Sequence, residues 1–151
     1  MLKTMLKPEF IFSNVKVDGL EREAAIQKIS EFCEENTGVS ASLLAEKFMD
    51  RERLDSTGFG NGVAIPHAKI PNLKNPMVAV TRFEEGIEWD AIDGEPVKVA
   101  IALIMPDGDE ANTHLQVIAQ LSRKLVHQET SNTLISEVDS MKLYNFMINE
   151  M

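Results

Sequence analysis

Apolar side chains recur at helical spacing in five stretches of the chain. Three of these stretches are long, namely residues 18–37, 41–54 and 111–126. Each carries apolar positions every three or four residues with charged residues between them. Two shorter stretches, near residues 131–137 and 140–149, show the same period. We therefore expect five helices, three of which follow one another at the end of the chain.

Other stretches have the composition of strands. Residues 9–17 are rich in β-branched and aromatic residues and predict one or two short strands, and residues 77–83 predict another. Residues 97–105 are almost continuously apolar, which is typical of a strand buried on both faces. Because strands and helices are interspersed along the chain, we predict an α/β fold with helices on both sides of a sheet.

Polar residues and glycines mark the predicted helix ends. Asp18 is a candidate N-cap with Glu21 as its capping-box partner, and Ser40 is a candidate N-cap for the next helix. Gly38 suits the stop between these two helices. The apolar faces that we expect to be buried comprise Ala25, Ile29, Phe32 and Cys33, then Leu44, Phe48 and Met49, and finally Leu115, Ile118, Ala119, Leu121 and Leu125.

The composition is that of an ordinary globular protein, with 44% hydrophobic and 26% charged residues. Its 151 residues match the usual size of one domain, so we predict a single domain over residues 1–151. The formal net charge of −9 leaves no excess of Lys and Arg to neutralise phosphates. This balance argues against nucleic acid or an anionic lipid surface as a partner.

Cysteine content and hydropathy bear on the compartment. Cys33 is the single cysteine, so no intramolecular disulfide forms, as suits a reducing compartment. The N-terminus lacks the continuous apolar stretch of a signal peptide. Residues 97–106 form the longest apolar run, but Lys98 interrupts it and it is too short to cross a bilayer as a helix. We expect a cytoplasmic protein without direct membrane insertion.

The segment that leads to His67 carries the most informative chemistry. Residues 56–62 read Ser-Thr-Gly-Phe-Gly-Asn-Gly, and the three glycines permit tight turns and the close approach of another group. The apolar residues 63–65 then lead into Pro66, whose fixed φ stiffens the approach, so we expect His67 at the end of a rigid element. A neutral imidazole held this way is a nucleophile at neutral pH. The alternative is a glycine-rich loop followed by a histidine that merely caps a strand.

Further residues are candidates for contacts with a phosphoryl group. His114 is predicted in the first turn of the helix at 111–126, where free N–H groups and the helix dipole favour an anion. Arg51, at the C-terminal end of its helix, has a guanidinium suited to bidentate contacts with phosphoryl oxygens. Arg53 and Lys69 compete with it for that role. The alternatives are a surface histidine at 114 and cations that are simply solvated.

No metal ion and no organic cofactor is expected. The acidic residues at 84–85 and 107–110 are interpreted as solvated loops, and near the site only Glu52 and the 107–110 loop offer carboxylates for magnesium. A weaker hypothesis groups the three histidines around zinc, but their spacing matches no standard zinc motif. We interpret the third histidine, His127, as a structural residue at a helix C-terminus.

Three stretches together resemble the phosphotransferase-system enzyme IIA domains of the fructose/mannitol type. The first is Arg51 and Glu52 followed by residues 56–67, which end Gly-Val-Ala-Ile-Pro-His and look like the active-site signature of that family. The others are residues 86–97, Gly-Ile-Glu-Trp-Asp-Ala-Ile-Asp-Gly-Glu-Pro-Val, and residues 114–125, which begin His-Leu-Gln. The resemblance covers nearly the whole chain.

The resemblance implies a fold, a role for each matching residue and two partners. The fold is an α/β sandwich with a mixed sheet flanked by helices. His67 matches the histidine that accepts the phosphoryl group, His114 the second active-site histidine that assists by hydrogen bonding, and Arg51 the arginine that stabilises phosphoryl charge. The implied donor is the histidine-containing phosphocarrier protein. The implied acceptor is a IIB component that serves a membrane IIC component, both on separate chains.

Two functions are open within this family. Trp89 with its neighbours, and Leu-Ser-Arg-Lys-Leu at residues 121–125, favour the fructose-like IIA proteins, which pass the phosphoryl group on for sugar uptake. Residues 56–62 also resemble the nitrogen-related regulatory IIA proteins, which act by phosphorylation-dependent binding of partners. Sugar uptake is our main interpretation and regulation is the alternative. The sequence gives neither the sugar, nor the oligomeric state, nor the strand order.

Overall fold

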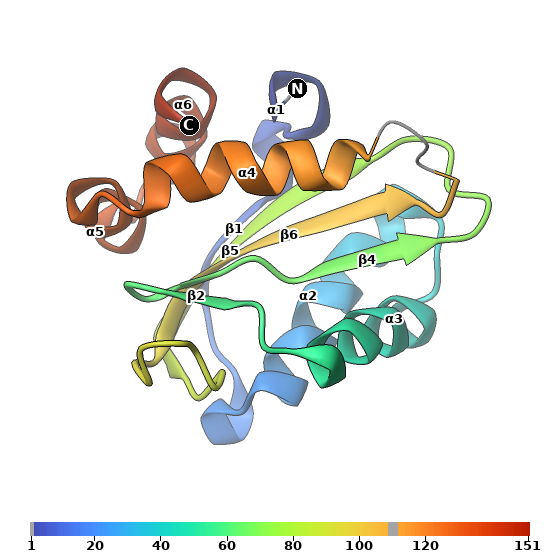
Figure 1. Ribbon diagram of the computed structural model, residues 1–151, viewed down its shortest axis with the longest axis horizontal. Helices are drawn as coiled ribbons and strands as arrows, with labels where there is room; N and C mark the ends of the chain where they lie inside the picture. Colours follow the sequence, from blue (N-terminus) through green and yellow to red (C-terminus); the bar gives the residue numbers. More distant parts are fainter. Residues whose placement is uncertain (1, 109–111) are drawn as a thin grey trace.

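The computed structural model describes residues 2–108 and 112–151, and within them a six-stranded sheet is covered by helices (Figure 1). The strands are β1 (Ile11–Val15), β2 (Gly58–Gly60), β3 (Val63–Ala64), β4 (His67–Ile70), β5 (Met77–Ile87) and β6 (Val97–Pro106). Their order is β1-β5-β6-β3-β2, and β4 also pairs with β6. β1 runs parallel to β5, and β3 and β4 run parallel to β6, whereas the pairs β5–β6 and β2–β3 are antiparallel. The mixed sheet implied by the resemblance is confirmed.

The helices lie on both sides of the sheet, as predicted. They are α1 (Leu2–Met5), α2 (Arg22–Thr37), α3 (Ala41–Leu54), α4 (Thr113–Leu125), α5 (Gln128–Ser136) and α6 (Ser140–Glu150), with short 3-10 turns η1 (Pro8–Phe10) and η2 (Asp18–Leu20). Figure 1 shows α4 crossing one face of the sheet and α2 and α3 on the other. No helix in the described part of the chain is both long enough and apolar enough to span a bilayer.

Two short strands, β3 and β4, pair with β6 one after the other, and the gap between them lies just before His67. β3 pairs with the first part of β6, and β4 pairs with it further along, from His67 onward. Between them, the N–H of Ile65 donates to the carbonyl of Thr57 (3.0 Å), outside the β3–β6 ladder, and Pro66 has no N–H to offer. His67 therefore opens a strand of its own, rather than ending the apolar stretch before it as we expected.

The start of α2 differs from the prediction. The helix begins at Arg22, because Gly19 and Leu20 adopt positive φ angles of 78° and 53°, which an α-helix does not accommodate. Asp18 therefore begins a 3-10 turn instead of the helix. Glu21 occupies the N-cap position and makes no side-chain capping bond, so the predicted capping box is wrong.

The boundary between α2 and α3 is confirmed. Gly38 ends α2 in the left-handed conformation, with φ of 72°, and its N–H donates to the carbonyl of Glu34. The hydroxyl of Ser40 accepts from the N–H of Leu43 (3.2 Å) and caps α3. The connection is so short that the two helices pack against each other. This packing fixes the direction in which the last turn of α3 points.

The core is built around β6, which is buried on both faces as predicted, with every side chain from Val99 to Met105 fully buried. Cys33 is also buried, and burial raises the pKa of its thiol to about 12, so it remains an inert core residue. Phe32, expected in the core, is only partly buried and stacks on Phe12 with the ring centroids 4.5 Å apart.

The inward face of α4 is only partly the one predicted. Its buried positions are His114, Val117, Leu121 and Leu125, which share one stripe of the helix. Leu115 is instead 54% exposed, Ile118 is only partly buried, and Ala119 is exposed. Apolar side chains are therefore left at the surface beside the first turns of α4.

Candidate functional site

Arg51 and His67 are in direct contact although they belong to different elements. Arg51 lies in the last turn of α3, and His67 is the first residue of β4. The Nε of Arg51 donates a hydrogen bond to Nε2 of His67 (3.0 Å). The Nη1 of the same guanidinium donates to the backbone carbonyl of Asp55, just beyond the helix. The guanidinium is therefore held between the end of α3 and the imidazole.

The hydrogen bonds of the His67 ring define its tautomer. Nδ1 lies 3.0 Å from the carbonyl oxygen of Ile65, and because a carbonyl only accepts, Nδ1 carries the proton. Nε2 accepts from Arg51 and is therefore unprotonated. The neutral ring thus directs the lone pair of Nε2, its nucleophilic atom, toward the guanidinium.

The pKa of His67 is lowered from its ordinary value of 6.5. Burial is the largest cause, because a charged imidazolium would lose its hydration, and the positive charges of Arg51, His114 and Lys69 act in the same direction. The hydrogen bond to the carbonyl of Ile65 opposes them, since it favours the protonated ring. The net effect keeps the ring neutral and nucleophilic at neutral pH.

His114 lies next to His67 at the start of another helix. It is the second residue of α4 and is 8% exposed, so it is not the surface histidine that the alternative supposed. The centroids of the two imidazole rings are 6.2 Å apart, and their planes are inclined by 39°. The positive end of the α4 dipole lies at the same place, which favours negative charge near both rings.

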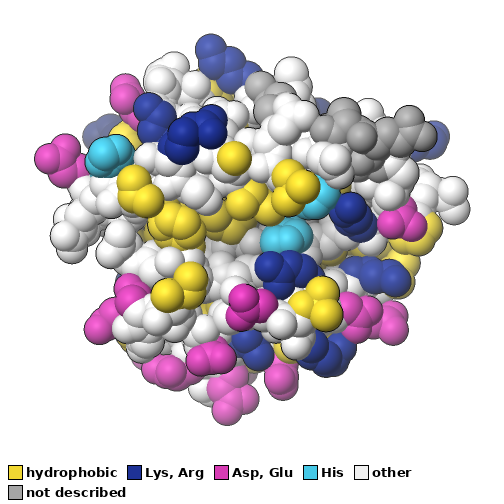
Figure 2. Space-filling view, in the orientation of Figure 1, with side chains coloured by type: hydrophobic (Ala, Val, Ile, Leu, Met, Phe, Trp, Pro, Cys, Tyr) yellow, Lys and Arg dark blue, Asp and Glu magenta, His cyan; other side chains and the backbone are white. Residues whose placement is uncertain are grey.

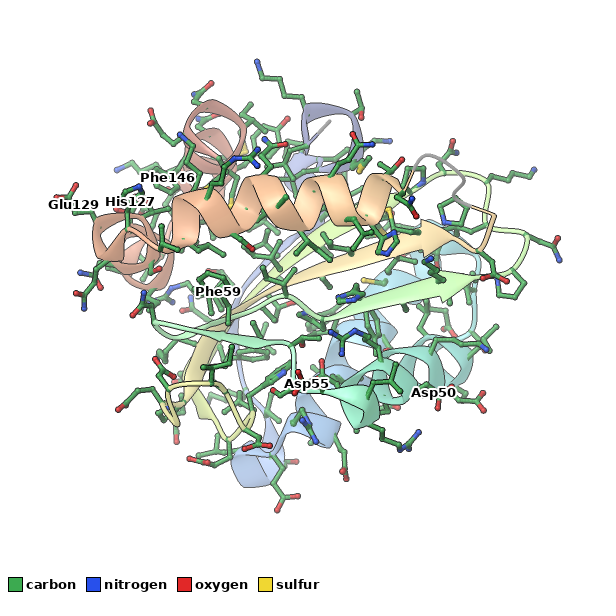
Figure 3. All side chains as sticks on the ribbon, in the orientation of Figure 1. Asp50, Asp55, Phe59, His127, Glu129 and Phe146 are labelled. Carbon is green, nitrogen blue, oxygen red and sulfur yellow. The ribbon has the colours of Figure 1, made fainter. Side chains whose placement is uncertain are left out.

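A cleft of about 140 Å³ opens beside these side chains. Arg51 and His67 are among the residues that line it, and so are the apolar residues Phe59, Ile92 and Ile118. Figure 3 shows Phe59 between β2 and α4, so the cleft lies where these two elements approach each other. The site therefore combines a nucleophilic nitrogen, a guanidinium and apolar walls, which suits the transfer of an anionic group from another molecule.

We call four apolar residues the apolar rim: Ile92 and Ile118, which line the cleft, Leu54, which follows Arg51 by three residues, and Leu115, which follows His114. Leu54 is 82% exposed, Ile92 85% and Leu115 54%. Figure 2 shows hydrophobic side chains gathered across this face beside two histidines. Exposed apolar patches of this kind mark sites where other proteins bind.

Glu52, considered above as a possible magnesium ligand and as part of the family signature, is a buried structural residue, which the sequence did not lead us to expect. The side chain is 3% exposed and accepts hydrogen bonds from Thr57 and Trp89. A usable signal was present in the sequence, because Glu52 follows Phe48 by one helical turn and so lies on the buried stripe of α3.

The competing cations and the third histidine lie apart from this contact. Arg53 is exposed and pairs with Asp50 (2.8 Å). Lys69 is exposed on β4 and acts on His67 through its charge. His127 is exposed at the junction of α4 and α5, and Figure 3 shows it on the opposite side of the view from Asp50.

Metal binding finds no support within residues 2–108 and 112–151. No three His, Cys, Asp or Glu side chains there are arranged to hold a metal ion. The zinc hypothesis needed His67, His114 and His127 together, so it is left without a ligand set. Of the acidic loop considered for magnesium, Asp109 and Glu110 lie outside the described residues.

The sequence matches a known protein family and its curated members. The profile of the family described as "Phosphoenolpyruvate-dependent sugar phosphotransferase system, EIIA 2" matches residues 4–150. The nitrogen regulatory protein of Bradyrhizobium diazoefficiens is 31% identical over 143 residues, covering 95% of this chain and 92% of that protein. The fructose-like EIIA component of Escherichia coli is 43% identical over 79 residues, covering 52% of this chain and 53% of that protein.

Solved structures share the fold. The nitrogen regulatory protein IIA-Ntr of Neisseria meningitidis superimposes with a TM-score of 0.87 at 26% identity, over 95% of this chain and 96% of that one. Enzyme IIA of the mannitol system from Escherichia coli, in complex with its phosphorylated IIB enzyme, gives a TM-score of 0.72 at 23% identity, over 93% and 99%. A domain of this fold thus pairs with a IIB component. Because the family profile spans nearly the whole chain, this protein belongs to the EIIA type 2 family of the phosphoenolpyruvate-dependent sugar phosphotransferase system.

Proposed function

We propose that this chain is a phosphocarrier that accepts a phosphoryl group on Nε2 of His67 and that its phosphorylation state controls which proteins it binds. The observation that carries the proposal is the ring geometry, in which Ile65 holds the Nδ1 proton and Arg51 faces the Nε2 lone pair. Membership of a phosphoryl-transfer family supports the chemistry.

Transfer begins when the Nε–H of Arg51 leaves Nε2, because that hydrogen bond occupies the lone pair. Nε2 then attacks the phosphorus atom of a donor phosphohistidine. The bond from phosphorus to Nε2 of His67 forms as the bond to the donor nitrogen breaks, and the electron pair of the broken bond stays on the donor ring. The proton stays on Nδ1, which continues to donate its hydrogen bond to the carbonyl of Ile65. This hydrogen bond stabilises the positive charge that the ring gains.

Arg51 and His114 then act on the transferred group. The guanidinium of Arg51, still held by the carbonyl of Asp55, can turn its released N–H toward the phosphoryl oxygens. The ring of His114, at the start of α4, lies close enough to His67 to donate to another of these oxygens. Both contacts stabilise charge on the phosphoryl group without a metal ion.

The donor that we propose is the histidine-containing phosphocarrier protein. A protein donor must bring its own phosphohistidine to the cleft, and the apolar rim offers it a surface to bind. The same surface serves the acceptor or binding partner, since each must approach the same nitrogen. Binding is therefore expected to alternate between partners, not to be simultaneous.

Regulation is supported better than sugar uptake. The nitrogen regulatory proteins match over almost their whole length and share the fold closely, whereas the fructose-like component matches over about half of this chain. Sugar uptake is the second candidate, favoured by the 43% identity of that shorter match. It would require a IIB component and a membrane IIC component.

Replacement of the nucleophile should abolish phosphorylation. We expect the wild-type protein to gain the mass of one phosphoryl group from the phosphorylated carrier protein or from phosphoramidate, a small donor that needs no docking surface. The modification should be acid-labile and base-stable, as a phosphorus–nitrogen bond is. His67→Ala should gain no mass, and the matched control His127→Ala should be modified normally. Normal modification of His67→Ala would show that another residue is the acceptor.

The fate of the label separates the two functions. If the protein is regulatory, we expect the phosphorylated chain to retain its label when mixed with purified IIB components of the fructose and mannitol types. Return of the label to the unphosphorylated carrier protein serves as the control for competence. Rapid passage of label to a IIB component would contradict the regulatory assignment and support sugar uptake.

Removal of Arg51 should change the titration of His67. In Arg51→Ala the pKa of His67 should rise, because a nearby positive charge and a donor to the neutral ring are both lost. Titration of the imidazole proton resonances by NMR measures this rise in pKa, with the exposed Arg53→Ala as control. In the wild type, the pKa of His67 is lower in the folded than in the unfolded protein, so the contribution of His67 to stability is lost as pH falls through about 6.5. An unchanged or lower pKa in Arg51→Ala would contradict the proposed contact.

A further inference from the structure

The carboxylate of Glu52 is the centre of a buried polar cluster one residue away from Arg51. Its Oε1 accepts the backbone N–H of Thr57 (3.0 Å) and the indole N–H of Trp89 (3.2 Å), and Nη1 of Arg22 lies 3.5 Å from the same oxygen. Its Oε2 accepts the hydroxyl of Thr57. The two oxygens therefore hold one short backbone segment, residues 55–58, against α3 and against Trp89.

That segment supports both sides of the site. The carbonyl of Asp55 accepts from Nη1 of Arg51 and so fixes the guanidinium. The carbonyl of Thr57 accepts the N–H of Ile65 (3.0 Å), and the carbonyl of Ile65 in turn holds Nδ1 of His67 (3.0 Å). A displacement of residues 55–58 would therefore move the guanidinium and the imidazole relative to each other.

The surroundings of the segment restrict it further. Gly58 packs closely against residues 89–92, because a Cβ added to Gly58 would lie only 2.6 Å from the Cα of Ala91. The hydroxyl of Ser56 donates to the carbonyl of Trp89 (3.1 Å), and the carbonyl of Gly58 accepts from the N–H of Ile92 (3.2 Å). Contacts from Ser56, Thr57 and Gly58 thus all tie the loop to residues 89–92, and Glu52 is the charged group at the centre of these ties.

We propose that Glu52 is a positioning residue for phosphoryl transfer, which holds residues 55–58 so that Arg51 is aimed at the phosphoryl group on His67. This inference rests on the proposed function of His67. The competing interpretation is that the buried carboxylate only stabilises the fold. Because misplacement of a catalytic group by about 1 Å costs roughly 100-fold in rate, a positioning role predicts a kinetic defect in protein that is still folded.

The first experiment compares single-turnover phosphorylation of wild type, Glu52→Ala and Glu52→Gln by the phosphorylated histidine-containing carrier protein. In Glu52→Ala the maximal rate should fall by roughly 100-fold, while the donor concentration at half-saturation stays unchanged, because the apolar rim is intact. Glu52→Gln should recover most of the rate, since its amide oxygen can still accept the N–H groups of Thr57 and Trp89. The matched control, Glu46→Ala on the exposed side of α3, should behave as wild type.

The second experiment tests whether Glu52 acts through Arg51. If it does, Glu52→Ala should slow transfer much less in an Arg51→Ala background than in the wild type, because the group that it aims is already absent. Thr57→Val, which removes one donor to the carboxylate and keeps the shape, should give an intermediate defect. Independent, multiplicative effects of Glu52→Ala and Arg51→Ala would overturn the inference.

Folding is monitored separately in every variant. Far-ultraviolet circular dichroism reports the secondary structure, and the fluorescence of Trp89, the single tryptophan, reports the cluster itself. If Glu52→Ala fails to fold, Thr57→Val carries the test, and a wild-type rate in that variant would overturn the inference. A wild type that takes no label contradicts the proposed function, whereas label uptake that Glu52→Ala leaves unchanged contradicts this inference alone.

Discussion

The hydrogen bond from Arg51 to Nε2 of His67 is the interaction on which the site depends. It joins the last turn of α3 to the first residue of β4, and it keeps Nε2 unprotonated while the ring is neutral. The same bond blocks the lone pair, so the resting site is held closed by the group that would later stabilise the phosphoryl charge. The guanidinium therefore has to move far enough to release the lone pair of Nε2, yet stay close enough to His67 to stabilise the phosphoryl charge.

The position of His67 depends on a gap between β3 and β4, the two strands that pair with the same side of β6. β3 and β4 pair with β6 in the same register, and Pro66, which lies between them, has no N–H to donate to β6. The carbonyl of Pro66 still accepts the N–H of Leu103 in β6 (2.9 Å), whereas the N–H of Ile65 donates to Thr57 and the carbonyl of Ile65 contacts Nδ1 of His67. The fully buried β6 supplies a rigid base for both of these strands.

Periodicity was sufficient to predict the existence of α2 to α6 and the buried strand β6, and residue type was sufficient for the caps at Gly38 and Ser40, whereas the short helix α1 was not predicted. It failed at the start of α2, where backbone angles at Gly19 and Leu20 override a capping-box pattern. It also misplaced Leu115 on α4, since the structure leaves this apolar side chain exposed, against the rule that apolar residues are buried.

The candidate site was predictable in part. The sequence motif singled out His67, Arg51 and His114, and the structure brings these side chains together. The burial of Glu52 could be predicted from its place one turn after Phe48, but its hydrogen-bond partners could not, because Thr57 and Trp89 meet it only through tertiary packing. Nor did the pattern reveal the tautomer of His67, which depends on the contact of Nδ1 with the carbonyl of Ile65.

The most direct test of this account is nitrogen-15 NMR of the histidine rings before and after phosphorylation. The account predicts that His67 of the resting protein is the neutral tautomer protonated on Nδ1, and that phosphorus couples to Nε2 after transfer. A resting ring protonated on Nε2, or a phosphoryl group attached to Nδ1, would contradict it.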